Sequence, residues 1–231
     1  MSKEKFSFYK EHPKTCQDDD FWGQVKRTVN GAPVSQEQID MIVVAVANGL
    51  QLNKQDSLLD MCCGNGALST LLFQQCQGGL GVDFSEHLIS IANKYFSTPP
   101  TQTYSLGDVV EFCAKPKVDQ KIFTKALCYG SFAYIEDERA ELLLRSMHQN
   151  FQNIERFFIG NLPDKDRLQE FYHKRSYESG IENEPDSAIG IWRTQGEFIA
   201  MAKRCGWQAE ISKMPEEYYS SHYRYDVVLF R

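Results

Sequence analysis

One stretch of eleven residues constrains the fold of this chain more than any other. Residues 58–68 read Leu-Leu-Asp-Met-Cys-Cys-Gly-Asn-Gly-Ala-Leu, so a short apolar run passes through two glycines into an apolar segment of helical character. This order is typical of a strand, a tight turn and a helix that together bind a cofactor at the carboxyl edge of a parallel sheet. The stretch therefore predicts an α/β fold with a nucleotide-like ligand at its turn.

A second strand, expected over Gly79–Asp83, carries the next signal. Asp83 follows Gly64 by nineteen residues, which is the spacing of an acid that accepts hydrogen bonds from ribose hydroxyls. Ser69 stands where a dinucleotide fingerprint has its third glycine. On spacing alone, both NAD and an adenosyl ligand remain open.

Asp60 favours one of these ligands over the other. It lies four residues before Gly64, at the mouth of the turn. A pyrophosphate bound there would meet a carboxylate of like charge, which is costly at close range. S-adenosylmethionine carries no phosphate, and its ammonium and sulfonium groups are cationic. We therefore expect S-adenosylmethionine as the cofactor and S-adenosylhomocysteine as its product.

The same residues resemble a known family. The segment 58–66 resembles motif I of class I S-adenosylmethionine-dependent methyltransferases of the small-molecule type, although Cys62 stands at the first glycine of the usual motif. Gly81–Ser85 is similar to the family's second-strand segment, and 106–109 is similar to the segment that meets the adenine ring. The resemblance implies these cofactor-binding residues: Asp60, Cys62, Gly64, Asn65, Gly66, Asp83, Phe84, Ser85, Asp108, Val109, Cys128 and Tyr129.

The remaining pattern of the chain predicts a doubly wound, Rossmann-like α/β fold. We expect seven strands, mostly parallel with an antiparallel last strand, and helices on both faces of the sheet. The expected strands are 57–61, 79–83, 101–105, 121–128, 154–160, 207–212 and 225–230. The expected helices are 36–49, 67–75, 86–96, 136–150 and 194–205, with Ser85 and Asp108 as helix N-caps.

The N-terminal segment is expected to form a helical cap. We predict that residues 1–35 are an arm over the active site and that 36–231 form the methyltransferase domain. Phe21–Val29 reads as a short amphipathic helix that Asn30 and Gly31 break. Ser35 followed by Gln38 resembles a capping box for the next helix.

The acceptor is expected to bind in three regions outside the glycine turn. The first region is the arm over residues 20–30. The second is the loop over residues 128–135, because the loop after the fourth strand of a doubly wound sheet faces the ligand crevice. The third is an insertion at about 163–192, which is a sensible place for a lid. The predicted acceptor-binding residues are Trp22, Ser131, Tyr134 and Tyr172, and the candidates for a catalytic role are His173, Tyr129 and His222. Ordinary packing remains the competing interpretation for Trp22 and Tyr134.

Composition narrows the class of protein. The chain has 231 residues and a formal net charge of −6, which disfavours nucleic acid as a partner. We expect no metal site, no membrane span and no signal peptide, and therefore a cytoplasmic protein. The seven cysteines include no CxxC pair, and Cys62-Cys63 reads as small buried residues rather than as nucleophiles. Oligomeric state cannot be read from the sequence.

The expected reaction is methyl transfer to an oxygen or nitrogen of a small molecule, such as a sugar or another secondary metabolite. Such a reaction proceeds by in-line displacement and needs a base only for a weakly acidic acceptor. Three alternatives stay open: an NAD(P)-dependent oxidoreductase, a non-catalytic adenosyl-binding or scaffold protein, and a methyltransferase that acts on a macromolecule.

Overall fold

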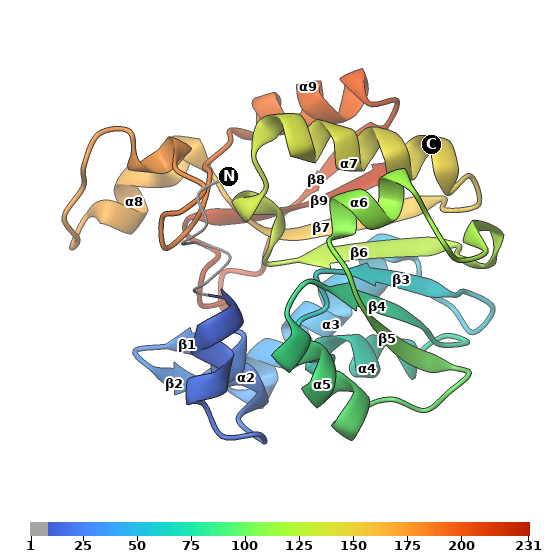
Figure 1. Ribbon diagram of the computed structural model, residues 1–231. Coiled ribbons are helices and arrows are strands. Elements are labelled where there is room, and N and C mark those ends of the chain that lie inside the picture. Colours follow the sequence, from blue (N-terminus) through green and yellow to red (C-terminus); the bar gives the residue numbers. More distant parts are fainter. Residues whose placement is uncertain (1–8) are drawn as a thin grey trace.

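A computed structural model describes residues 9–231 and contains one seven-stranded sheet (Figure 1). The strand order is β5-β4-β3-β6-β7-β9-β8. Only the pairs that β9 makes with β7 and β8 are antiparallel, which confirms the predicted fold class. The strands are β3 (Leu58–Met61), β4 (Gly79–Asp83), β5 (Gln102–Leu106), β6 (Lys125–Tyr129), β7 (Arg156–Pro163), β8 (Gln208–Ser212) and β9 (Arg224–Phe230).

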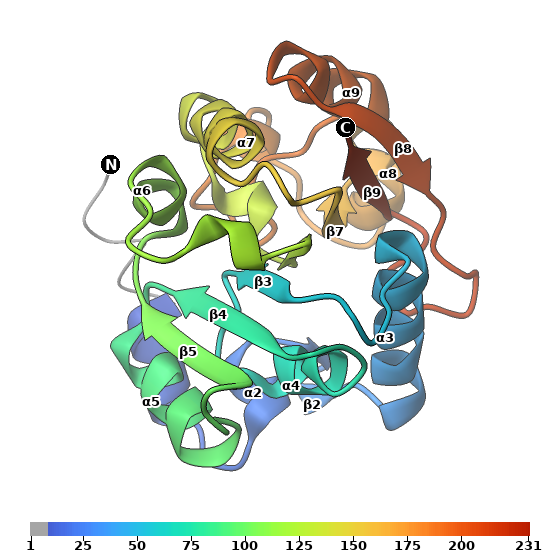
Figure 2. The ribbon, with the colours of Figure 1, turned by 90° about the vertical axis from the view of Figure 1, so that its right-hand side faces the viewer.

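Helices cover both faces of this sheet (Figure 2). Side chains of α6, α7 and α9 form one apolar core with one face, and side chains of α3, α4 and α5 form a second core with the other. Each layer follows the helical spacing of apolar residues in the sequence. The helices are α3 (Gln36–Leu50), α4 (Ala67–Phe73), α5 (Glu86–Tyr95), α6 (Val109–Ala114), α7 (Asp137–Asn150) and α9 (Gln195–Arg204). No helix among residues 9–231 is both long enough and apolar enough to span a bilayer.

The central strands are buried on both faces. Every residue of β3 and β6 is buried, as expected of parallel strands that lie between two helical layers. Asp60 in β3 and Lys125 in β6 are the acidic and the basic residue of these strands, and Lys125 Nζ lies 3.1 Å from a carboxylate oxygen of Glu155. The crossover from β3 through α4 to β4 fixes the loop after β3 at the carboxyl edge of the sheet.

The arm differs from the predicted helix over Phe21–Val29, which is wrong in extent. Helix α2 covers only Phe21–Gln24, and Lys26 then adopts a left-handed φ of 55°. The next residues form a small hairpin of β1 (Thr28–Val29) and β2 (Ala32–Pro33). Asn30 and Gly31, with φ of 52° and 82°, supply the positive φ angles that a two-residue hairpin turn requires.

The predicted capping box at α3 is also wrong. Ser35 is the N-cap residue, but its side chain makes no capping hydrogen bond. The Gln38 side chain instead donates to the Glu217 carbonyl oxygen and accepts a hydrogen bond from the Tyr219 backbone N–H. A long-range contact thus takes the place of the local one, and it ties the segment before β9 to α3.

The segment after β7 is irregular and carries α8 (Leu168–Tyr172). Trp192 is its buried centre, with ring centroids 5.5 Å from that of Phe171 and 5.9 Å from that of Tyr223. In Figure 1, α2 and α8 lie at the same end of the molecule, below and above the carboxyl ends of the parallel strands. That end of the sheet is therefore flanked by both segments.

Candidate cofactor and acceptor site

The turn after β3 is built from left-handed backbone. Cys62, Gly64 and Gly66 have φ of 62°, 59° and 80°, and Gly66 is the N-cap of α4. Glycine reaches these angles without strain, whereas Cys62 adopts one at a cost. The turn thereby brings its backbone close to whatever binds at the carboxyl edge.

We expect Gly66→Ala to lower the free energy of unfolding by about 2 kcal/mol or more, from the positive φ and from overpacking. A Cβ at Gly66 would lie 2.8 Å from the Tyr104 ring and 3.1 Å from the Ala92 methyl carbon, both of them buried. Urea unfolding followed by circular dichroism measures the change. Gly31→Ala, which has a positive φ but open space around it, is the control for backbone strain alone. Equal losses in the two variants would contradict the packing part of this account.

Asp83 closes the turn from the neighbouring strand. Its Oδ2 accepts a hydrogen bond from the Gly64 N–H at 3.0 Å, and its Oδ1 accepts one from the Ser85 N–H at 2.9 Å. Burial raises the pKa of this carboxyl to about 6, although these backbone bonds favour the charged form. Each carboxylate oxygen has a second lone pair, so Asp83 retains the capacity to accept hydrogen bonds from a ribose.

Asp60 lies beneath the turn rather than at its surface. The Ser69 hydroxyl of α4 donates to Asp60 Oδ2 at 2.5 Å. Burial raises the pKa of Asp60 to about 7, whereas the Ser69 bond and the charge of Arg27 act in the opposite direction. Asp60 is therefore poised to gain negative charge when a cation approaches the turn.

These two raised pKa values predict that cofactor binding depends on pH. Cations and ribose hydroxyls both favour ionised carboxylates, so the affinity for S-adenosylhomocysteine should rise about tenfold or more from pH 5.5 to pH 8. The unfolded state releases these protons near pH 4, so the same shifts lower the stability of the ligand-free protein as pH rises from 4 to 7. Isothermal titration calorimetry across this range measures the affinity. In Asp60→Asn the slope should flatten, and an unchanged slope would contradict the assignment.

Asn65 joins the turn to the N-terminal arm. Its Nδ2 donates to the Phe21 carbonyl oxygen at 2.7 Å and to Gln24 Oε1 at 2.8 Å, and its Oδ1 accepts from the Ala67 N–H. Both oxygen partners of Nδ2 belong to α2. The sequence pattern placed Asn65 at the cofactor, and the structure shows that its side chain holds the arm against the turn.

Arg27 is a residue that the sequence reasoning missed. Its Cζ lies 5.4 Å from the ring centroid of Trp22 and 5.3 Å from that of Tyr129, at the end of β6. Within residues 9–231, no acidic side chain forms an ion pair with Arg27. A single arginine in a polar arm gives no signal in sequence, because the ring it contacts lies far along the chain.

The other predicted cofactor residues line the same edge. Asp108 caps α6 through the N–H groups of Val110 and Glu111, and its Oδ2 pairs with Arg139 at 2.6 Å. Ser85 caps α5 and is fully buried. Phe84 is half-buried, and Val109 is buried at the start of α6.

The thiols at this edge favour a packing role. A side-chain hydrogen bond with Cys128, together with burial, raises the pKa of Cys62 well above the usual value, and burial does the same for Cys63. Buried thiols of this kind stay protonated and are poor nucleophiles. Cys63 is buried and Cys62 is partly buried, so packing rather than nucleophilic chemistry is the role that both thiols suit.

The loop after β6 carries two of the predicted acceptor residues, Ser131 and Tyr134. Before them, at the end of β6, Tyr129 is buried, and its hydroxyl oxygen lies 3.0 Å from that of Tyr218. Tyr134 donates to the Ala188 carbonyl oxygen at 2.9 Å, and Ser131 is half-buried beside it in sequence. Tyr134 therefore links this loop to the insertion after β7.

The remaining candidates are Tyr172, His173 and His222, and they do not form one cluster. Tyr172 packs in the aromatic cluster around Trp192, whereas His173 is exposed at the end of α8. His222 is exposed as well, and its ring lies edge-on to Tyr223. No side-chain hydrogen bond joins either histidine to another described residue. Neither one has a partner that would orient it as a base.

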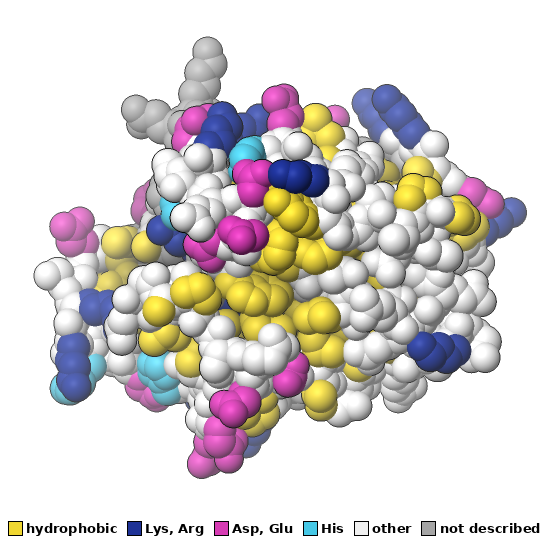
Figure 3. Space-filling model, turned by 90° about the horizontal axis from the view of Figure 1, so that it is seen from below, with side chains coloured by type: hydrophobic (Ala, Val, Ile, Leu, Met, Phe, Trp, Pro, Cys, Tyr) yellow, Lys and Arg dark blue, Asp and Glu magenta, His cyan; other side chains and the backbone are white. Residues whose placement is uncertain are grey.

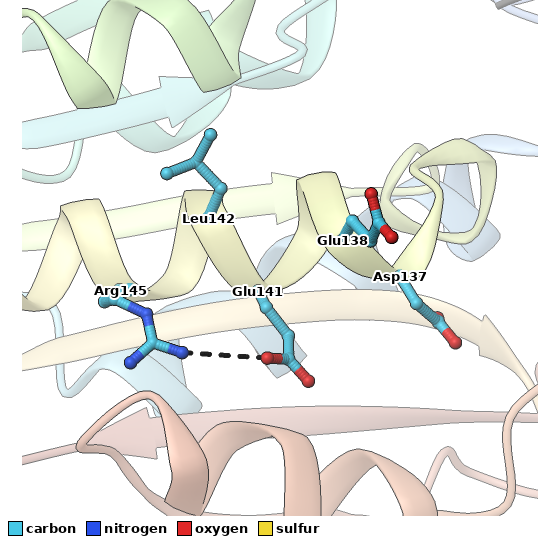
Figure 4. A pocket seen from close by; sticks show the side chains of 5 residues that line it. All are labelled: Asp137, Glu138, Glu141, Leu142 and Arg145. Atoms are coloured by element: carbon cyan, nitrogen blue, oxygen red, sulfur yellow. Dashed lines mark ion pairs between the residues drawn. The ribbon is translucent and has the colours of Figure 1, made fainter.

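A surface hollow of about 380 Å³ lies elsewhere, on the outer face of α7 (Figure 4). All five residues that line it belong to that helix, and Glu141 pairs with Arg145 across it. None of the predicted site residues lines this hollow, so we assign it no part in the chemistry.

Comparisons with known proteins bear on this site. Residues 58–153 match the sequence model of a family described as a methyltransferase domain. A comparison with curated proteins gives no match. Among solved structures, the chain is similar to magnesium protoporphyrin IX methyltransferase (ChlM) from Synechocystis PCC 6803 with bound SAH, at 15% identity and a TM-score of 0.60, over 85% of this chain and 83% of that one.

Two further structures are similar along the whole chain. One is the DhpI-SAM-HEP complex, at 14% identity and a TM-score of 0.65, over 100% of this chain and 99% of that one. The other comes from a complex of the Haloferax volcanii Trm112 methyltransferase activator with a methyltransferase, at 13% identity and a TM-score of 0.65, over 100% and 98%. At these identities the likeness concerns the fold. The match over 58–153 identifies this segment as a methyltransferase domain, and the solved structures show that the whole chain shares the fold of such enzymes.

Proposed function

We propose that this protein transfers a methyl group from S-adenosylmethionine to an oxygen or nitrogen of a small molecule, such as a sugar or another secondary metabolite. The observation that carries the proposal is Asp83, a buried carboxylate that is held by the N–H groups of Gly64 and Ser85 and still has lone pairs for a ribose. When bound, the cofactor supplies an electrophilic methyl group on a sulfonium.

The residues of the turn and arm have separate tasks in this proposal. Asp83 accepts hydrogen bonds from the ribose, and Asp60 places negative charge under the cationic part of the cofactor. Arg27 donates to the carboxylate of the methionine moiety, since its guanidinium has no ion-pair partner among residues 9–231. Asp108 and Val109 contact the adenine ring in this proposal.

The residues on the acceptor side of the site are suited to holding the acceptor in place rather than to transferring a proton. The exposed histidines, His173 and His222, have no orienting partner in the described chain, and burial raises the pKa of Tyr129. Holding the acceptor in line with the methyl group and excluding water accounts for the catalysis. Trp22, Ser131, Tyr134 and Tyr172 contribute to this enclosure from the arm, the loop after β6 and the insertion over 163–192.

A small acceptor is favoured over a nucleic acid. On the face seen from below, Lys and Arg side chains are scattered and form no continuous patch (Figure 3). The net charge of −6 disfavours long-range attraction of a polyanion. Arm and insertion flank the carboxyl edge, which suits a compact acceptor.

Transfer of a labelled methyl group tests the proposal. Purified protein is incubated with methyl-deuterated S-adenosylmethionine and a metabolite extract, and products are detected by mass spectrometry. We expect a labelled small molecule that depends on Asp83. Tight binding of S-adenosylhomocysteine without any transfer would instead support the scaffold alternative, and a nicotinamide-dependent product would support the oxidoreductase.

A further inference from the structure

The acceptor side of the sheet edge contains a second arginine that the cofactor does not account for. Arg224 is the first residue of β9, which runs antiparallel, so it lies at the same edge as the ends of the parallel strands. Its Nη1 donates to the Asn161 carbonyl oxygen. Asn161 follows Gly160, whose carbonyl oxygen accepts from the Gly130 N–H, so Arg224 stands beside the loop after β6.

Aromatic side chains surround this guanidinium. Its Cζ lies 4.9 Å from the ring centroid of Tyr223, and Tyr134, Tyr219 and Tyr9 are within electrostatic range of it. Burial raises the pKa of Tyr134 and of Tyr9, so both rings are neutral at physiological pH. The tyrosines therefore contribute hydroxyl groups but no negative charge.

No carboxylate among residues 9–231 pairs with Arg224. Asp226 is the acidic group in electrostatic contact with it, but its Oδ1 accepts the Asn161 N–H at 2.7 Å. Burial raises the pKa of Asp226 to about 7, so it is partly protonated at neutral pH. It offsets the charge of Arg224 only in part.

The aromatic cluster next to Arg224 contains a further N–H group that donates no hydrogen bond to residues 9–231. Trp192 is 1% exposed, its ring packs on Tyr223, and its Nε1 has no hydrogen-bond partner in the described chain. Buried donors are nearly always satisfied in folded proteins, and a half-buried cation is costly without a counter-charge. This end of the edge thus has more hydrogen-bond donors and positive charge than residues 9–231 satisfy.

We infer that the acceptor carries an anionic group, a carboxylate or a phosphate, and that Arg224 binds it through guanidinium N–H groups other than those that Asn161 and Tyr223 engage, with Tyr134 and Tyr223 beside it. This inference rests on the proposed methyl transfer and narrows its acceptor class. The anionic group faces β9 while the nucleophilic atom faces the loop after β6. Guanidinium geometry suits carboxylate and phosphate alike.

Fractionation of acceptors by charge tests the inference. A metabolite extract is separated on an anion-exchange resin, and the bound and unbound pools are incubated with the full-length protein and methyl-deuterated S-adenosylmethionine. We expect the labelled product in the pool that the resin retained. Phosphatase treatment of that pool before the reaction then distinguishes a phosphate, which is lost as an acceptor, from a carboxylate, which is not.

Variants assign the effect to Arg224. In Arg224→Gln the KM for the retained acceptor should rise tenfold or more with unchanged affinity for S-adenosylhomocysteine, and Arg224→Lys should recover part of the loss. Arg145→Gln, on the outer face of α7, should match the wild type. Labelled product from the unbound pool alone, or an unchanged KM in a folded Arg224→Gln, would overturn the anionic acceptor while methyl transfer itself stands. No transfer from either pool would overturn the proposed function and this inference with it.

Discussion

Asp83→Asn is expected to weaken the binding of S-adenosylhomocysteine by a hundredfold or more. Hydrogen bonds to a charged acceptor each contribute roughly 1.5–3 kcal/mol, and a ribose offers two hydroxyl donors to this carboxylate. The variant also removes one acceptor from the paired N–H groups of Gly64 and Ser85, so the turn itself loosens. Isothermal titration calorimetry at pH 8, where the wild-type carboxyl is ionised, measures the loss.

Asp56→Asn is the matched control for this experiment. Asp56 is also a buried aspartate that accepts hydrogen bonds from a backbone N–H and from side chains, but it precedes β3 at the opposite edge of the sheet. Its loss should reduce stability and leave the affinity nearly unchanged. If Asp83→Asn kept the wild-type affinity, the ribose would have to be held elsewhere.

Arg27→Gln is expected to weaken the same binding by about ten- to a hundredfold, the value of one charge-assisted hydrogen bond. Arg27 also lowers the pKa of Asp60, so its removal should shift the pH dependence of binding upward as well. Titrations at pH 6 and pH 8 separate the two effects, since the loss should be larger at pH 6.

Arg156→Gln provides the comparison for Arg27. Arg156 is likewise partly buried over an aromatic ring, Phe230, but it begins β7 at the edge remote from the turn. A similar loss of affinity in both variants would indicate a general effect of arginine removal. An unchanged affinity in Arg27→Gln would leave the cofactor carboxylate without an assigned partner.

The strands of the sheet could be predicted from the sequence, because the pattern that indicates each strand lies within the strand itself. Each buried strand of the parallel region is a short apolar run, and each helix carries its own periodicity, so order and type could be predicted from β3 to β9. The spacing between Gly64 and Asp83 similarly predicted a pair that the structure joins by a 3.0 Å hydrogen bond. Boundaries moved by a few residues, most of all at β6, which begins at Lys125 rather than at Lys121.

The parts that could not be predicted depend on contacts between distant segments. The helix predicted over Phe21–Val29 is shorter in the structure, because Thr28 and Val29 instead form a strand of a hairpin whose turn is Asn30 and Gly31. Arg27 meets Tyr129, and Arg224 meets Asn161, only after the chain has folded. Neither arginine stands in a pattern that would distinguish it from a solvated surface residue.

The most direct test of the central account is a calorimetric titration of the purified protein with S-adenosylhomocysteine and, separately, with NADH. The account predicts one binding site per chain for S-adenosylhomocysteine, with an affinity that depends on Asp83, and no heat of binding with NADH. Tight binding of NADH without a response to S-adenosylhomocysteine would contradict it, because Asp60 would then have failed to exclude a pyrophosphate from the turn.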